Sequence, residues 1–138
     1  MDTCAWCRPF DKLSDQRIIR ESNAIANIFK KVDSREIEII GSVVLNAEIS
    51  MIKPGIKEET VQSLVKYIAT SFPIITDSVE ILAKELIRIC AIDAMDALHL
   101  AVAIENKAEV FITTDDIILN KVKCISRYGI AVKNPCEV

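Results

Sequence analysis

The chain has 138 residues, 51% of them hydrophobic, and a formal net charge of −3. This size and apolar content predict a single folded domain over residues 1–138 and exclude a largely disordered chain. The longest uncharged run, 67–76, has ten residues and is too short to span a membrane. Because the chain carries no excess of positive charge, a bound polyanion would need a local cation.

The cysteines and the first residues indicate a cellular compartment. The chain has five cysteines and lacks the basic start and apolar stretch of a secretory signal. An odd number of cysteines without an export signal predicts free thiols in a reducing cytoplasm rather than disulfide bridges.

Short apolar segments alternate with amphipathic ones along the chain. Strands are expected at Met1–Cys4, Ile37–Gly41, Ile74–Thr76, Val110–Thr113 and Ile130–Val132. Helices are expected at about Asp15–Val32, Ser42–Ile52, Glu58–Ser71, Asp77–Ile89, Asp93–Asn106 and Asp115–Val122. Strands that alternate with helices and are rich in Ile and Val predict a parallel sheet covered on both faces. The fold class is therefore a helix-rich α/β protein of three layers, with a short, mostly parallel central sheet.

A carboxylate stands on the apolar face of the expected helix Ser42–Ile52. At about 100° per residue, Glu48 lies in the middle of the arc formed by Val44, Leu45 and Met51. Burying an unpaired carboxylate costs several kcal/mol, so such a residue needs a cationic partner or a metal ion. The sequence leaves both open: an Arg or Lys from another element, or a metal.

The expected helix Asp93–Asn106 is apolar nearly all round, and Asp93, Asp96 and His99 form its only polar stripe. Asp93 is the expected N-cap, and Asp96 in the first turn would complement the helix dipole; this structural interpretation explains Asp96 less well than Asp93, since a buried helix needs only one cap. His99, the only histidine, is expected to be a packed or hydrogen-bonded core residue rather than a metal ligand.

Two further acids follow apolar strands. Asp115 comes directly after the strand that ends in Thr113, where ligands bind in parallel α/β sheets, and Asp2 follows the expected strand stub at the start. Either Asp115 or Asp116 is also expected to cap the next helix. Acids at strand ends and on buried helix edges, with a single histidine, favour a hard divalent cation such as Mg²⁺ or Mn²⁺ over zinc.

In this order the motifs resemble the PIN-domain family of metal-dependent ribonucleases, and specifically its small prokaryotic members. The matching motifs are Asp2-Thr3, Ser42 followed by Glu48, Asp96-Ala97-Leu98-His99-Leu100-Ala101, and Thr113-Thr114-Asp115. The resemblance implies that Asp2, Glu48, Asp96 and Asp115 are the catalytic and metal-binding residues. It also implies that Thr113 and Thr114 hydrogen-bond to these acids.

The resemblance further implies the reaction and the partners. The expected activity is Mg²⁺- or Mn²⁺-dependent hydrolysis of single-stranded RNA, with backbone contacts from Arg8, Lys12, Arg17 or Lys121. Small members act as toxins with a protein antitoxin or in RNA processing, so an antitoxin is an expected partner. A homodimer, as in relatives, is expected to use the helices between Glu58 and Ile89.

Two alternative functions and the role of one further acid stay open from the sequence. The family's first strand is several residues long, whereas only Met1 precedes Asp2, so a catalytically incomplete module that binds nucleic acid or a protein partner is one alternative. The Cys4-x-x-Cys7 pair suggests thiol redox chemistry as another. Glu21 shares the apolar face of its helix and is expected either to support the other acids or to pair with Arg8 or Arg17.

Overall fold

The computed structural model describes all residues from 1 to 138. The helices are α1 (Thr3–Cys7), α2 (Gln16–Asp33), α3 (Val43–Ser50), α4 (Ile56–Ile68), α5 (Asp77–Cys90), α6 (Ala94–Glu105), α7 (Asp116–Leu119) and α8 (Val122–Ile125). The strands are β1 (Val110–Ile112) and β2 (Ala131–Lys133), and three short 3₁₀ turns are η1 (Arg8–Phe10), η2 (Ser126–Tyr128) and η3 (Pro135–Glu137). No helix is long and apolar enough to cross a bilayer.

The sheet is parallel but smaller than expected. β1 pairs with β2 in parallel, with Phe111 opposite Val132, and Ile40 forms an isolated parallel bridge with Ser71. The backbone N–H of Asp2 donates to the carbonyl of Ile112 at 3.1 Å, which places the start of the chain beside β1. The prediction of a helix-rich α/β fold with a parallel sheet is confirmed, and the strands β1 and β2 lie within one residue of their predicted positions.

Three of the five predicted strands are not strands in the structure, and two of these three form no β-bridge at all. Residues Met1–Cys4 do not form a strand, because the Asp2 carboxylate accepts the N–H of Ala5 and starts α1 at Thr3. α1 therefore adds a helix before the first predicted one, Asp15–Val32. Residues Ile74–Thr76 pair with no other segment, and the Thr76 hydroxyl instead accepts the N–H of Val79 to start α5.

Two further boundaries differ because backbone groups find other partners. The segment predicted as the strand Ile37–Gly41 keeps only the bridge at Ile40, and α4 ends at Ile68 rather than Ser71. In that region the N–H of Thr70 donates to Ile39 and the N–H of Gly41 to Ser71, which draws residues 70 and 71 out of the helix. The helix predicted for Asp115–Val122 is broken into α7 and α8.

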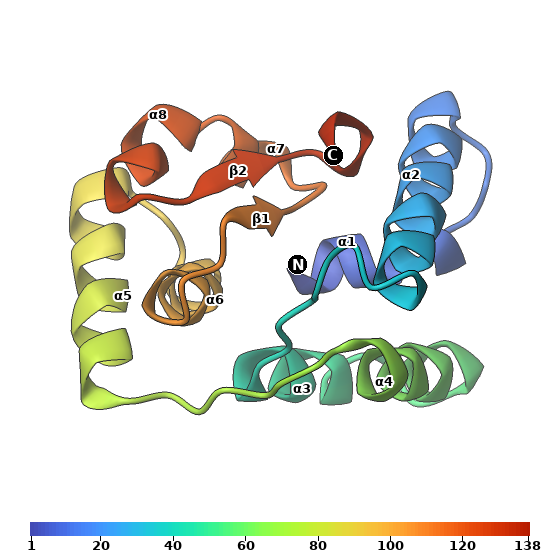
Figure 1. Cartoon of the computed structure of the whole chain (residues 1–138), viewed down its shortest axis with the longest axis horizontal. Helices are drawn as coiled ribbons and strands as arrows, with labels where there is room; N and C mark the ends of the chain where they lie inside the picture. Colours follow the sequence, from blue (N-terminus) through green and yellow to red (C-terminus); the bar gives the residue numbers. More distant parts are fainter.

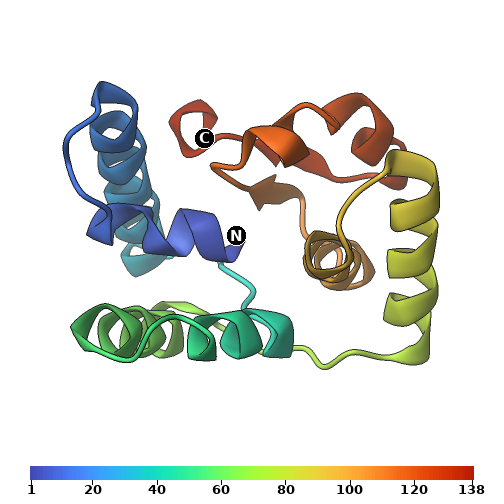
Figure 2. The same cartoon turned by 180° about the vertical axis from the view of Figure 1, so that it is seen from behind.

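The core consists of two clusters of buried side chains. One is built around α5, α6, α8 and the two strands, and the other around α1, α2, α3 and α4. Figures 1 and 2 show α5 and α6 on one side of the molecule, α1 and α2 on the other, and β1 and the N-terminus between them. The first cluster's elements carry Asp96 and lead into Asp115, whereas the second cluster's elements carry Asp2 and Glu48. The four acids are therefore carried by elements from both halves of the core.

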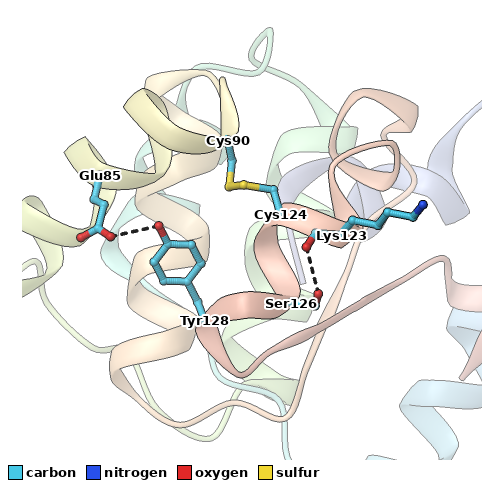
Figure 3. The surroundings of a disulfide bond; sticks show 6 residues. All are labelled: Glu85, Cys90, Lys123, Cys124, Ser126 and Tyr128. Carbon is cyan, nitrogen blue, oxygen red and sulfur yellow. Dashed lines mark hydrogen bonds between the residues drawn. A yellow bond between two sulfur atoms is a disulfide. The ribbon is translucent and has the colours of Figure 1, made fainter.

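A disulfide corrects the expectation that all thiols are free. Cys90, the last residue of α5, is bonded to Cys124 in α8, with a Cα–Cα distance of 5.7 Å (Figure 3). The hydroxyl of Tyr128 donates to Glu85 at 3.1 Å beside the bridge, which further ties η2 to α5. The two cysteines are 34 positions apart, so only the packing of α8 against α5 shows that they meet. Cys4, Cys7 and Cys136 are free.

Candidate active site

Asp2 is a buried carboxylate with both oxygens engaged. It is 3% exposed, its Oδ1 accepts the Ala5 N–H at 2.9 Å, and its Oδ2 accepts the hydroxyl of Thr113. Burial raises the pKa of Asp2, and these two hydrogen bonds only partly oppose that rise. Asp2 thus caps α1 and, through its backbone hydrogen bond to Ile112, also lies at the end of β1. Its carboxylate is fixed at this position although no strand precedes it.

Thr113 connects two of the predicted acids. Its hydroxyl donates to Asp2 and accepts the backbone N–H of Asp115 at 2.9 Å, and the residue is fully buried. The predicted hydrogen bonding of Thr113 to the acids is therefore present in the structure. Thr114 differs, because its buried hydroxyl has no hydrogen-bond partner in the protein. Only one of the two predicted threonines contacts an acid.

Asp115 lies at the start of α7 and keeps one oxygen free. Its Oδ1 accepts the N–H of Ile117 at 2.8 Å, so Asp115 rather than Asp116 is the N-cap of that helix. Its Oδ2 has no hydrogen bond to the protein. Asp115 lines a cavity of about 500 Å³ together with Thr3 and Cys4 of α1.

Glu48 meets neither Arg nor Lys. The hydroxyl of Thr3 and Nε2 of the buried His99 both hydrogen-bond to its Oε2, which leaves Oε1 without a protein partner. The contact with His99 and, to a lesser extent, that with Thr3 lower the pKa of Glu48. The expectation that His99 is a hydrogen-bonded core residue agrees with this contact. Thr3 and His99 together fix the orientation of Glu48 and keep it ionised.

Asp96 has no hydrogen bond or ion pair in the protein. Burial, followed by the negative charges of Asp2 and Asp115, raises its pKa from 3.8 to about 6. Asp93 occupies the N-cap position of α6, as predicted, and its side chain makes no capping hydrogen bond. Asp96 is therefore an ionisable group for which the fold supplies no compensating partner.

The surroundings of Cys4 show that the four acids face a common region. Burial raises the pKa of this thiol to about 12, and the charges of Asp2, Asp115, Asp96 and Glu48 all add to the rise. Burial likewise raises the pKa of Cys7. A thiol held protonated is a poor nucleophile, so the geometry disfavours redox chemistry at this C-x-x-C pair.

A hard divalent cation is bound by carboxylate oxygens that no basic side chain neutralises. Asp2, Asp96 and Asp115 have no ion pair with Lys or Arg, and free carboxylate oxygens remain on Glu48, Asp96 and Asp115. No three acidic, histidine or cysteine side chains are close enough to hold an ion between them as they stand. Carboxylate oxygens without a cationic partner are the ligand type that a hard divalent cation prefers.

A network of ion pairs borders the acids. The buried Glu21 contacts Nε of Arg8 at 2.8 Å and Nε of Arg17 at 2.9 Å, and it accepts a hydrogen bond from Asn134 at 2.7 Å. Of the alternatives for Glu21, the ion pairs with Arg8 and Arg17 are both present. Arg17 also holds Asp116 and the carbonyl of Thr114, on either side of Asp115.

Comparison with known protein families decides the assignment. The sequence model described as PIN domain matches residues 1–123 of the 138 residues. The chain belongs to the PIN-domain family. No curated protein and no solved structure gives a significant match to it. PIN domains are generally nucleases, they bind nucleic acids and they commonly use divalent metal ions.

Two contacts of this PIN domain were missed from the sequence. Thr3 was read only as part of the Asp2-Thr3 motif, although its hydroxyl holds Glu48 from a position 45 residues away. The bidentate contact between Arg17 and Asp116 joins residues 99 positions apart. Spacing along the chain gives no signal for either contact, since both depend on how α1 and α2 pack beside the end of β1.

Proposed function

We propose that this PIN domain is a Mg²⁺- or Mn²⁺-dependent endoribonuclease that cleaves single-stranded RNA at the cluster formed by Asp2, Glu48, Asp96 and Asp115. One observation carries the proposal. The carboxylates of Asp2, Glu48, Asp96 and Asp115 have no ion pair with Lys or Arg, only Glu48 contacts a histidine, and the pKa of Asp96 is raised to about 6. A fold does not gather such charge without cost, and metal binding is the function that uses it.

The chain's own residues have separate parts in this proposal. Asp96 and Asp115 offer free carboxylate oxygens as metal ligands, and Asp2 adds a carboxylate fixed by Ala5 and Thr113. Glu48, fixed through Oε2 by Thr3 and His99, presents Oε1 either as a ligand or to orient the attacking water. A bound divalent ion supplies the positive charge that stabilises the scissile phosphate and the leaving 3′ oxygen.

The test is cleavage of a fluorescently labelled single-stranded RNA with Mg²⁺, with Mn²⁺ and with excess chelator. Wild-type protein is expected to cut the RNA only in the presence of metal. Asp96→Asn and Asp115→Asn are expected to lower the rate by at least roughly a hundredfold, the order of effect seen when one group that stabilises the transition state is lost. Asp93→Asn is the matched control, because Asp93 is exposed on the same helix and makes no capping bond.

The alternative is a PIN domain that binds nucleic acid or a protein partner without cutting. The observation that favours it is that no three donor side chains meet in the structure as it stands. RNA binding that survives in chelator, with no cleavage under any metal condition, would decide for this alternative.

We also infer that a second copy of the chain covers the exposed apolar side chains between Glu58 and Ile89. Tyr67 in α4 is 81% exposed, and Ile74 and Ile81 are 66% and 67% exposed. These exposed apolar side chains are spread over α4, the connection after it and α5, and a partner surface that removes them from water supports the inference. The molar mass in solution tests this inference, and Ile81→Glu is expected to shift a dimer to monomers.

A protein antitoxin as partner stays a prediction from the family resemblance.

A further inference from the structure

Arg17, near the start of α2, is held on two sides by very different partners. Its Nε donates to Glu21 at 2.9 Å and its Nη2 to the Thr114 carbonyl at 3.1 Å. Both Nη atoms also donate to the two oxygens of Asp116, at 2.7 and 2.8 Å. Glu21 therefore orients the guanidinium through Nε, and Asp116 occupies the two Nη donors.

The two carboxylates differ in how firmly they are held. The side chain of Glu21 is 2% exposed and has additional contacts with Arg8 and Asn134, whereas the side chain of Asp116 is 64% exposed. An exposed ion pair is weak because water screens its charges and both side chains lose conformational freedom when they pair. Asp116 is thus the replaceable partner, and removing it leaves the guanidinium oriented by Glu21 and Thr114.

The position of Arg17 relative to the acids matters as much as its contacts. Arg17, Asp115 and Asp116 line the same cavity of about 500 Å³. Among the basic residues considered for RNA contacts, Arg8 also lines this cavity, but Lys12 and Lys121 do not. The guanidinium of Arg8 is engaged by Glu21 and Asp11 and its side chain is only 19% exposed, compared with 43% for Arg17.

We propose that Arg17 binds a backbone phosphate of the RNA, and that Asp116 occupies the same face of the guanidinium until the phosphate displaces it. A bidentate carboxylate and a phosphate each present paired oxygens, so both fit the Nη1 and Nη2 donors of Arg17. The inference rests on the proposed function and adds to it a residue that contacts the substrate. Asp116 acts against binding, since its negative charge competes with the phosphate.

The test measures RNA binding separately from cleavage. Every protein carries Asp96→Asn to block the proposed cleavage, and the probe is a fluorescein-labelled oligouridylate whose anisotropy is followed in Mg²⁺. Asp116→Asn is expected to tighten binding by about three- to tenfold, and Arg17→Gln to weaken it by about tenfold, the range of one hydrogen bond to a charged group. Arg17→Lys keeps the charge but loses the paired donors, so its affinity is expected to lie between those of wild type and Arg17→Gln.

Two control variants separate a local contact from a change in net charge. Asp33→Asn and Lys30→Gln alter exposed residues near the other end of α2 that have no ion pair. Asp33 is sixteen positions from Arg17, roughly 24 Å along the helix and well beyond the Debye length of about 10 Å at 0.1 M salt. Both controls are expected to leave affinity nearly unchanged. A second readout is salt dependence: Arg17→Gln should flatten the log–log slope by about 0.7 because one phosphate contact is lost, whereas Asp116→Asn should leave the slope nearly unchanged.

Binding by Asp116→Asn that is weaker than, or equal to, that of Asp33→Asn would overturn the proposal, because Asp116 would then only support the fold. This result decides the matter even if Arg17→Gln does not fold. The outcome is independent of the cleavage assay. A protein that binds RNA more tightly without Asp116 but never cuts it would keep this inference and lose the ribonuclease function.

Discussion

Asp96 is the residue whose charge the fold compensates least. It has no hydrogen bond or ion pair, and its neighbours Asp2 and Asp115 add negative charge. A carboxyl group with a pKa raised in the folded state binds its proton more tightly there than in the unfolded chain. Its ionisation therefore opposes folding as pH rises between 3.8 and about 6, and the penalty is fully present above that range.

Asp96→Asn removes this penalty while keeping the side-chain shape. At neutral pH and without metal the variant is expected to be more stable than wild type by about 1–2 kcal/mol, a figure reduced for solvent screening because Asp96 is only half-buried. Below about pH 4 the two proteins are expected to have the same melting temperature, since both are then neutral at position 96. Thermal melting in chelator at the two pH values measures this. A lower melting temperature at neutral pH would show that Asp96 has a structural partner.

The adjacent threonines give a matched pair of substitutions. Thr113→Val removes a buried hydroxyl that bonds both Asp2 and Asp115, so a loss of about 1–3 kcal/mol in the free energy of unfolding is expected. Thr114→Val removes a buried hydroxyl that has no partner, and its effect is expected to be neutral or slightly stabilising. Chemical denaturation compares the two variants. Equal losses would contradict the assignment of Thr113 as the link between the acids.

At the residue scale, the sequence could identify unusual charges but not their partners. Glu48 and Asp96 are detectable because each stands on a helix face that is otherwise apolar. The partners of Glu48 are Thr3 and His99, from α1 and α6, and only the tertiary fold brings them together. Asp93 lies at the N-cap of α6 as predicted, although its side chain makes no capping hydrogen bond.

The elements with strong local signals were predicted well. The amphipathic helices α2 and α5 and the apolar strands β1 and β2 lie close to their predicted positions. The start of the chain was not predicted, because an apolar stub followed by Asp fits a strand end and a helix N-cap equally well, and the capping bond to Ala5 decides between them. The residues Ile74–Thr76 are β-branched but lack a neighbouring strand, so their propensity alone does not form a strand.

The disulfide between α5 and α8 gives a prediction at the scale of elements. In unfolded, unreduced protein, titration is expected to find three accessible thiols rather than five. Reduction, or the double substitution Cys90→Ser and Cys124→Ser, is expected to lower the free energy of unfolding by about 2–4 kcal/mol, because the unfolded chain regains the freedom of the closed loop. Five thiols in protein purified without reductant would contradict the bond.

At the scale of the whole molecule, the acids lie where the two clusters of the core meet. Asp2 and Glu48 belong to elements of one cluster, and Asp96 and Asp115 to elements at the other. The geometry of the acids therefore depends on how the two halves pack against each other. An ion bound by acids from both halves would join them, so metal binding is expected to stabilise the entire fold and not only the loop after β1.

The measurement that tests this most directly is the anomalous scattering of crystals grown or soaked with Mn²⁺. We expect an anomalous peak bound by oxygens of Asp96 and Asp115, with Asp2 or Glu48 contributing directly or through water, and no such peak in Asp96→Asn crystals. Saturating Mn²⁺ that leaves this region empty, or an ion that sits elsewhere on the surface, would contradict the claim that these acids form a metal centre.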